Sequence, residues 1–123
     1  MKNKEKILVA EDDLALLETL AIMLKDKYEI YTARNGEELI RLFKEKKPDL
    51  VVTDILMPEI DGVEATKRIL EIDPNAIVIG ITAYYLSKAK SLLEAGAKEV
   101  LEKPFTRKKL IETIEKYLSK SKT

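Results

Sequence analysis

The stretch Val51–Gly62, which reads VVTDILMPEIDG, shows how this chain is built. The apolar run Leu50–Thr53 ends on an acid, Asp54, although charged residues are rarely found in segments with the character of a buried strand. Met57-Pro58 then predicts a rigid turn, and Asp61-Gly62 predicts the start of a helix. The stretch therefore predicts a strand, a loop and a helix, with a carboxylate at the point where the strand ends.

The same alternation of apolar run and amphipathic segment continues along the whole chain. Because parallel strands need crossover connections, five such units predict an α/β fold. We expect one domain spanning residues 1–123, with a core at about 5–119 and a doubly wound parallel sheet, flavodoxin-like, in strand order 2-1-3-4-5. The expected strands are Lys6–Ala10, Tyr28–Ala33, Leu50–Thr53, Ala76–Ile81 and Val100–Glu102, and the expected helices are Leu14–Leu24, Gly36–Lys46, Gly62–Ile72, Ser87–Ala95 and Arg107–Leu118.

Local patterns add detail to this outline. Asn35-Gly36 predicts a turn that closes the second strand, and Gly96 predicts the end of the fourth helix. Asp13 is expected to cap the first helix. The core face of that helix is predicted from helical spacing to be Leu16, Leu20, Met23 and Leu24.

Composition excludes several classes of function. The 123 residues include neither cysteine nor histidine, so the chain itself supplies no disulfide, no thiolate or imidazole metal site, no Ser-His-Asp triad and no phosphohistidine. A net charge of zero argues against a dedicated nucleic-acid binder. The longest apolar runs are about five residues, too short for a membrane span or a signal peptide, and we therefore expect a soluble, cytoplasmic protein.

The polar candidates for chemistry follow the expected strands. Glu11 and Asp12 follow the first strand, Asp54 ends the third, Thr82 ends the fourth and Lys103 follows the fifth. In a sheet of this type, ligands bind beyond the carboxyl ends of the strands, where the strand order reverses. The first and third strands are neighbours at that point, so the three acids should meet. Carboxylates that close repel one another unless a divalent cation offsets their charge.

Four segments, ILVAEDD, VVTDILMPEIDG, IGITAY and LEKPF, resemble in this order the receiver domain of response regulators, the CheY-like family of two-component signalling. The resemblance covers the whole chain. It implies that Asp54 accepts a phosphoryl group and that Glu11 and Asp12 hold Mg²⁺ together with Asp54 and the backbone carbonyl of Leu56. Thr82 would then be the switch hydroxyl.

The resemblance also assigns a role to the last motif. Lys103 would supply a positive charge to the transferred phosphoryl group, and a cis peptide is expected between Lys103 and Pro104. The phosphoryl donor must lie elsewhere, because this chain has no histidine: a histidine kinase, a histidine phosphotransfer protein or a small acyl phosphate could serve. The domain would signal by binding, without turning over a substrate.

Two surfaces are expected to meet partners. Leu14 and Leu17 on the first helix, with Phe105 across the mouth of the site, suit transient docking of a kinase. The output protein is expected to bind the face of the fourth strand, the fourth helix and the fifth strand. Receivers commonly carry Tyr or Phe three residues before the lysine, but this chain has Val100. We therefore expect the signal to leave through the Ala83–Leu86 loop and the helix after it.

Taken one at a time, several of these residues could have a purely structural role. Glu11 and Asp12 alone could cap the following helix, Thr82 could simply end its strand, and Tyr84 and Tyr85 could pack on the surface. The acids and the lysine taken together favour a metal-dependent phosphorylation site.

Rival families fit less well. An aspartyl-phosphate phosphatase of the haloacid dehalogenase type would need a second aspartate at position 56, which is Leu56; a flavodoxin would need a phosphate-binding loop after the first strand; and an inactive receiver would have lost the acids or the lysine. The terminal KYLSKSKT favours a complete regulator over a receiver cut from a hybrid kinase or transcription regulator.

Overall fold

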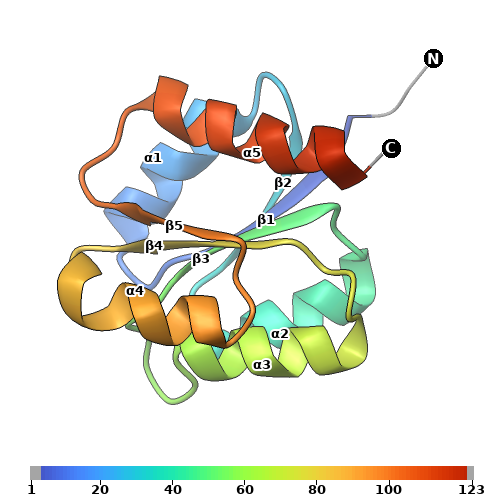
Figure 1. The fold of residues 1–123 in the computed structure, drawn as a ribbon. Coiled ribbons are helices and arrows are strands. Elements are labelled where there is room, and N and C mark those ends of the chain that lie inside the picture. The colour runs from blue at the N-terminus through green and yellow to red at the C-terminus, as the bar shows by residue number, and fades with distance from the viewer. Residues whose placement is uncertain (1–3, 122–123) are drawn as a thin grey trace.

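A five-stranded parallel sheet runs through the middle of the computed structural model, which describes residues 4–121 (Figure 1). The strand order is β2-β1-β3-β4-β5, so the predicted flavodoxin-like topology is confirmed. The strands are β1 (Lys6–Ala10), β2 (Glu29–Ala33), β3 (Leu50–Asp54), β4 (Val78–Thr82) and β5 (Glu99–Glu102), and the helices are α1 (Leu14–Leu24), α2 (Gly36–Lys46), α3 (Gly62–Ile72), α4 (Tyr85–Glu94) and α5 (Arg107–Ser121).

The helices cover both faces of the sheet, with α1 and α5 on one side and α2, α3 and α4 on the other (Figure 1). Successive side chains of a strand point to opposite faces, so each central strand supplies both cores. Leu8, Val51 and Val78 pack toward α2, α3 and α4, whereas Val52 and Ile79 pack toward α1 and α5. Every residue of β3 and β4 is buried, as expected for strands covered on both faces.

Several element boundaries differ from the expected ones. β4 begins at Val78 and not at Ala76, because pairing with β3 starts at Val78, although Ala76 and Ile77 are buried. α4 begins at Tyr85, two residues before the expected Ser87, and no side chain caps its start, so the sequence carries no cap signal there. Shifts of one residue place Glu29 at the start of β2, Glu99 at the start of β5, Asp54 at the end of β3, Thr82 at the end of β4 and Glu94 at the end of α4. α5 continues three residues beyond the expected Leu118, to Ser121.

The chain bends at Arg34 and Asn35 directly after β2, as the Asn35-Gly36 signal predicts, and the Asn35 side chain also accepts a hydrogen bond from the Glu38 amide (2.8 Å) and caps α2. One local prediction was wrong. The core face of α1 is Leu17, Leu20 and Leu24, while Leu16 and Met23 are only half-buried at its margin. Both sets repeat at helical spacing, and only the packing against β1 and α5 selects between them.

The predicted caps at Asp13 and Gly96 are confirmed. Asp13 Oδ1 accepts hydrogen bonds from the amides of Ala15 and Leu16, at 3.0 and 3.3 Å. Gly96 follows α4 with a φ of 118°, a conformation that favours glycine. Within residues 4–121, none of the helices combines the length and the apolar character that a membrane span requires.

Candidate functional site

The carboxyl ends of four neighbouring strands bring the predicted site residues together. β1 pairs with β3 through Ala10 and Thr53, so Glu11 and Asp12, which follow β1, lie beside Asp54. β4 pairs with β5 through Thr82 and Glu102, and Lys103 follows directly. Residues separated by as many as 92 positions thus meet at one edge of the sheet.

The three acids form one cluster. Glu11, Asp12 and Asp54 each present a carboxylate oxygen, and these oxygens lie within 4.8 Å of one another. Glu11 and Asp54 are 1% and 6% exposed, whereas Asp12 is open to solvent. The cluster therefore combines two buried carboxylates with one that can be reached from water.

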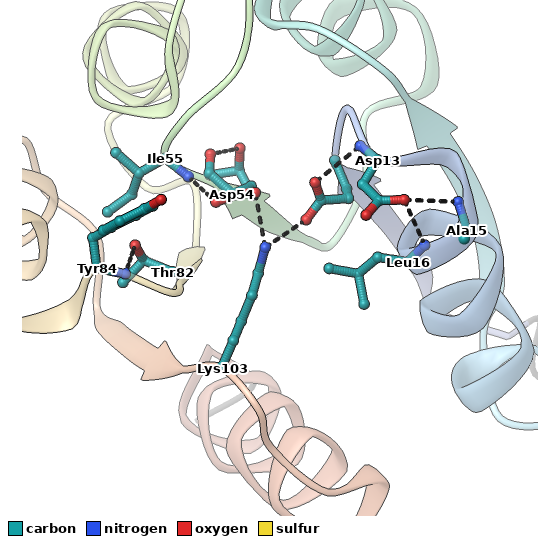
Figure 2. A network of polar contacts seen from close by, with 10 residues as sticks. Asp13, Ala15, Leu16, Asp54, Ile55, Thr82, Tyr84 and Lys103 are labelled. Atoms are coloured by element: carbon teal, nitrogen blue, oxygen red, sulfur yellow. Dashed lines mark hydrogen bonds and ion pairs between the residues drawn. The ribbon is translucent and has the colours of Figure 1, made fainter.

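Lys103 is the cation that faces this cluster. Its Nζ donates hydrogen bonds of 2.9 Å to Glu11 Oε1 and 2.9 Å to Asp54 Oδ2, and Figure 2 shows the lysine side chain reaching Asp54. A buried carboxylate is costly unless it is paired and hydrogen-bonded. The lysine meets this requirement for both buried acids at once.

Burial and the neighbouring charges shift the pKa values of Glu11 and Lys103. The pKa of Glu11 is raised from 4.5 to about 7: burial is the largest cause, the neighbouring Asp54 acts in the same direction, and the hydrogen bonds from Lys103 and the Asp13 amide oppose them. Burial alone would lower the pKa of Lys103, but its bonds to Glu11 and Asp54 outweigh that effect, so the pKa of Lys103 is raised. The lysine therefore stays protonated, and the site favours additional positive charge.

Asp54 is held in place from both sides. Its Oδ1 accepts a hydrogen bond of 2.7 Å from the Ile55 amide, while its Oδ2 faces Lys103. The Thr53 hydroxyl donates to the Asp54 carbonyl oxygen at 2.9 Å. The carboxylate orientation is thus fixed by backbone and lysine together before any ligand is present.

The loop after Asp54 returns closely over the strand end. Gly62 donates a hydrogen bond of 2.7 Å to the Ile55 carbonyl, and a Cβ on Gly62 would lie 2.2 Å from the Asp54 carbonyl oxygen. Only glycine permits this approach. Sequence reasoning assigned Gly62 to a helix start and missed the contact, although a glycine at a first helical position was the available signal.

Leu56 lies in the same loop, with a side chain 42% exposed. Its carbonyl oxygen accepts no hydrogen bond from the part of the chain that the structure describes. It therefore has free acceptor capacity, as a metal-ligating carbonyl must have.

Thr82 and the Lys103–Pro104 peptide complete the site. Thr82 is fully buried and its Oγ1 accepts a hydrogen bond of 2.9 Å from the Tyr84 amide, which leaves the hydroxyl proton available for donation (Figure 2). The Lys103 amide donates to the Thr82 carbonyl at 2.9 Å, and the expected cis peptide at Lys103–Pro104 is present.

One contact of the site was not anticipated. The Asp13 amide donates a hydrogen bond of 3.1 Å to Glu11 Oε2, so the start of α1 holds the second oxygen of Glu11.

The residues expected to dock a kinase differ in their exposure to solvent. Leu14 is 46% exposed, but Leu17 is only 3% exposed and belongs to the core. Phe105 is half-buried.

Comparisons with known proteins agree on one family. A family model described as the response regulator receiver domain matches residues 7–115. The chemotaxis protein CheY of Thermotoga maritima is 38% identical over 109 residues, which cover 85% of this chain and 91% of that protein.

Two solved structures show the same similarity. A response regulator receiver domain protein from Clostridium thermocellum superposes with a TM-score of 0.90 at 33% identity, covering 96% of this chain and 97% of that one. A CheX–CheY complex with BeF₃ and Mg²⁺ from Borrelia burgdorferi contains a chain with a TM-score of 0.88 at 30% identity, covering 94% of this chain and 90% of that one.

Proposed function

The chain belongs to the response regulator receiver domain family, and on this premise we propose that it accepts a phosphoryl group on Asp54 from a histidine kinase or a histidine phosphotransfer protein. The observation that carries the proposal is the double hydrogen bond of Lys103 to Asp54 and Glu11. It places a mobile positive charge against the carboxylate that would react.

The transfer would form one bond and break another. A carboxylate oxygen of Asp54 forms the new O–P bond, while the bond from phosphorus to the donor breaks on the opposite side. The leaving group, an imidazole nitrogen or an acyl oxygen, keeps the electron pair of the broken bond. Lys103 would then pair with a phosphoryl oxygen, and the Thr82 hydroxyl would donate its proton in a hydrogen bond to another.

The acidic cluster fits a divalent cation. Three carboxylate oxygens within 4.8 Å are hard ligands of the kind that Mg²⁺ prefers, and the exposed Asp12 leaves room for the waters that Mg²⁺ retains. Asp12, Asp54 and the Leu56 carbonyl would hold the ion, with Glu11 acting through a bound water. When bound, the cation would offset negative charge on the phosphoryl oxygens. The CheY of Borrelia burgdorferi crystallised with both BeF₃ and Mg²⁺.

The product of this reaction would be a binding signal. We propose that the domain is not an enzyme acting on a separate substrate and that it functions in the cytoplasm, where its kinase would phosphorylate it. The output protein would bind the face formed by β4, α4 and β5. Exposed apolar side chains on this face, Tyr85 at 38% and Leu93 at 43%, support the assignment.

Phosphorylation by acetyl phosphate tests the site directly. Wild-type protein should gain one phosphoryl group by intact-mass spectrometry, and Asp54→Asn should gain none, because the amide is not a nucleophile for phosphorus. Adding a chelator of Mg²⁺ should abolish labelling as well. The matched control is Asp26→Asn, which changes an exposed acid far from the site and should label normally. Full labelling of Asp54→Asn, or labelling that persists in the chelator, would refute the assignment.

A second prediction concerns the surface on which a kinase would dock. Leu14, Leu56 and Phe105 each lie two residues along the chain from a site residue: Asp12, Asp54 and Lys103, respectively. Leu14→Glu should slow transfer from a histidine kinase by about tenfold, the scale of losing one interface anchor.

The control for docking lies on the same helix. Ile22, in the last turn of α1, is 62% exposed, and Ile22→Glu makes the same change at the far end. It should leave transfer from the kinase unchanged. Labelling by acetyl phosphate needs no docking partner and is the internal reference. Equal slowing of Leu14→Glu with both donors would indicate a folding defect and rule out docking at this residue.

A further inference from the structure

A cavity of about 600 Å³ lies at the edge of the sheet opposite the carboxylate cluster. Its walls are Pro74 and Asn75 from the α3–β4 connection, Ile77 just before β4, Lys98 just before β5, and Tyr117 and Lys120 from α5. The α3–β4 connection and the end of α5 both lie at the right in Figure 1, away from the end at which β4 leads into α4. The volume is within the range of about 300–1,000 Å³ typical of small-molecule sites.

The lining of this cavity is positively charged. Lys98 and Lys120 contribute two ammonium groups, and no acidic residue lines the cavity within residues 4–121. The ammonium of Lys98 has no ion pair or hydrogen bond with the described residues. A cation placed on a concave surface without a partner favours an anionic ligand.

Glu99, the acid next to Lys98 in the sequence, is already engaged. Glu99 Oε1 accepts hydrogen bonds from Lys116 Nζ at 3.0 Å and from the Tyr117 hydroxyl at 2.9 Å. Partial burial alone would raise the pKa of Glu99, but these bonds outweigh it, so the pKa is lowered. Glu99 therefore remains ionised and paired with Lys116, which leaves Lys98 to a ligand.

The same contacts hold an aromatic wall in place. The Tyr117 hydroxyl is fixed by Glu99 and by the Lys98 carbonyl at 3.3 Å, and Lys116 and Lys120 lie over the ring at 5.0 and 5.4 Å from its centroid. Pro74 and Ile77 add apolar surface to the cavity. The ring is held by its hydroxyl and by two cations over it, so it offers a fixed aromatic edge to the cavity.

Asn75 supplies polar recognition. Its backbone amide donates to Asp73 Oδ1 at 2.9 Å, but its side-chain amide has no hydrogen bond among residues 4–121. A free amide offers one acceptor and two donors at the wall of the cavity.

We propose that this cavity binds a small aromatic anion of the size and chemistry of a nucleoside monophosphate. The planar base would pack against Pro74, Ile77 and the edge of the Tyr117 ring. The phosphate would pair with Lys98 and Lys120, and the Asn75 amide would meet a base edge. This site is separate from the carboxylate cluster and does not depend on phosphorylation of Asp54.

The test is a titration of ¹⁵N-labelled protein with AMP, followed by NMR in a buffer with a chelator, so that no divalent ion links a phosphate to the carboxylate cluster. Adenosine and inorganic phosphate are titrated separately. AMP should bind with a dissociation constant of about 1 mM or tighter, with shift changes at residues 74–77, 98 and 117–120. Each part alone should bind at least about tenfold more weakly.

Three variants sharpen the test. Lys98→Gln and Lys120→Gln should each weaken AMP binding about fivefold, the effect of losing one partly exposed charge pair. The matched control is Lys108→Gln, which removes the same charge from the far end of α5 and should leave the affinity unchanged. Equal weakening by Lys108→Gln would show a general charge effect and overturn the site.

Other outcomes would also overturn the proposal. One is the absence of shift changes up to about 10 mM AMP. Another is a set of shift changes confined to the edge of the sheet near Asp54. Binding of inorganic phosphate as tight as that of AMP would exclude the aromatic part of the ligand.

Discussion

At the scale of single residues, the carboxylate that we propose as the phosphoryl acceptor is held by groups that are themselves fixed by the backbone. Asp54 ends a fully buried strand, and its two carboxylate oxygens face the Ile55 amide and the Lys103 ammonium. Gly62 allows the start of α3 to approach the Asp54 carbonyl, so one glycine joins the strand end to the next helix. The geometry around this carboxylate is therefore set partly by Ile55 and Gly62, which would take no part in the proposed chemistry.

Gly62→Ala tests this role. The added methyl group would lie 2.2 Å from the Asp54 carbonyl oxygen and 2.9 Å from the Ile55 Cα, both backbone atoms that cannot rotate away. We expect the free energy of unfolding to fall by about 2 kcal/mol, as measured by urea denaturation. Ser119→Ala, at an exposed helical position of α5, is the control and should change stability little. An unchanged midpoint for Gly62→Ala would show that the contact does not constrain the loop.

At the scale of elements, α4 is the helix with the fewest anchors in the described part of the chain. Only Ala89 and Leu92 are buried, its start has no side-chain cap, and Leu86 is 99% exposed. The contact that holds it is close: a Cβ on Gly80 of β4 would lie 2.0 Å from Leu92 Cδ2. Val100 is 6% exposed in the same core cluster as Leu92 and cannot move in and out of solvent as a large aromatic could.

The start of α4 is therefore where we expect the signal to leave. Thr82 Oγ1 now accepts from the Tyr84 amide, and a phosphoryl oxygen would draw the hydroxyl toward Asp54. A charge-assisted hydrogen bond of this kind contributes about 1.5–3 kcal/mol. If it forms only in the active state, it shifts the conformational ratio by about tenfold to a hundredfold.

NMR with beryllofluoride, a stable mimic of the phosphoryl group, measures this shift. Resonances of residues 83–95 should move when beryllofluoride and Mg²⁺ are added to the wild type, and these changes should shrink in Thr82→Ala. Thr19→Ala is the control, because its hydroxyl donates within α1 to the Ala15 carbonyl and should have no influence. Changes limited to the phosphorylation pocket, with residues 83–95 silent in the wild type, would argue against this route.

At the scale of the whole molecule, a buried tyrosine ties the helical layer of α1 and α5 to the sheet. Tyr28 is 3% exposed, and its hydroxyl donates to Glu115 Oε2 on α5. Burial raises the pKa of Tyr28, and the hydrogen bond to Glu115 raises it further. The folded state therefore holds the phenolic proton more firmly than the unfolded state does.

This difference makes stability sensitive to alkaline pH. The contribution of Tyr28 is fully present below the unfolded pKa of about 10 and is lost as pH rises toward the folded pKa. The destabilisation caused by Tyr28→Phe should be about 1 kcal/mol near pH 8 and should shrink above about pH 10.

Urea denaturation at several pH values measures the effect. Tyr84→Phe is the control, because the Tyr84 hydroxyl has no hydrogen-bond partner within residues 4–121. The difference in the free energy of unfolding between the wild type and Tyr28→Phe could instead stay constant with pH. That result would mean that the Tyr28 hydroxyl is not preferentially protonated in the folded state.

The order of the elements could be predicted because apolar runs and helical spacing are local properties of the chain. The edge that carries the site followed from topology, since Glu11, Asp54 and Lys103 each come directly after or at the end of a strand. Contacts that depend on three-dimensional approach could not be predicted. An example is the pairing of Tyr28 with Glu115, 87 positions away. The start of α4 was missed because it carries no local cap.

Lys103 behaves as a tethered counterion. Glu11, Asp12 and Asp54 carry three negative charges when all are ionised, and Lys103 carries one positive charge. The four side chains together then have a net charge of −2, which a single divalent cation neutralises. A diffusible ion leaves when its concentration falls, but a covalently attached one cannot be diluted away. If the proposed function holds, the lysine would keep the acidic cluster assembled while metal is scarce, so that the site would be ready for metal and phosphoryl donor together.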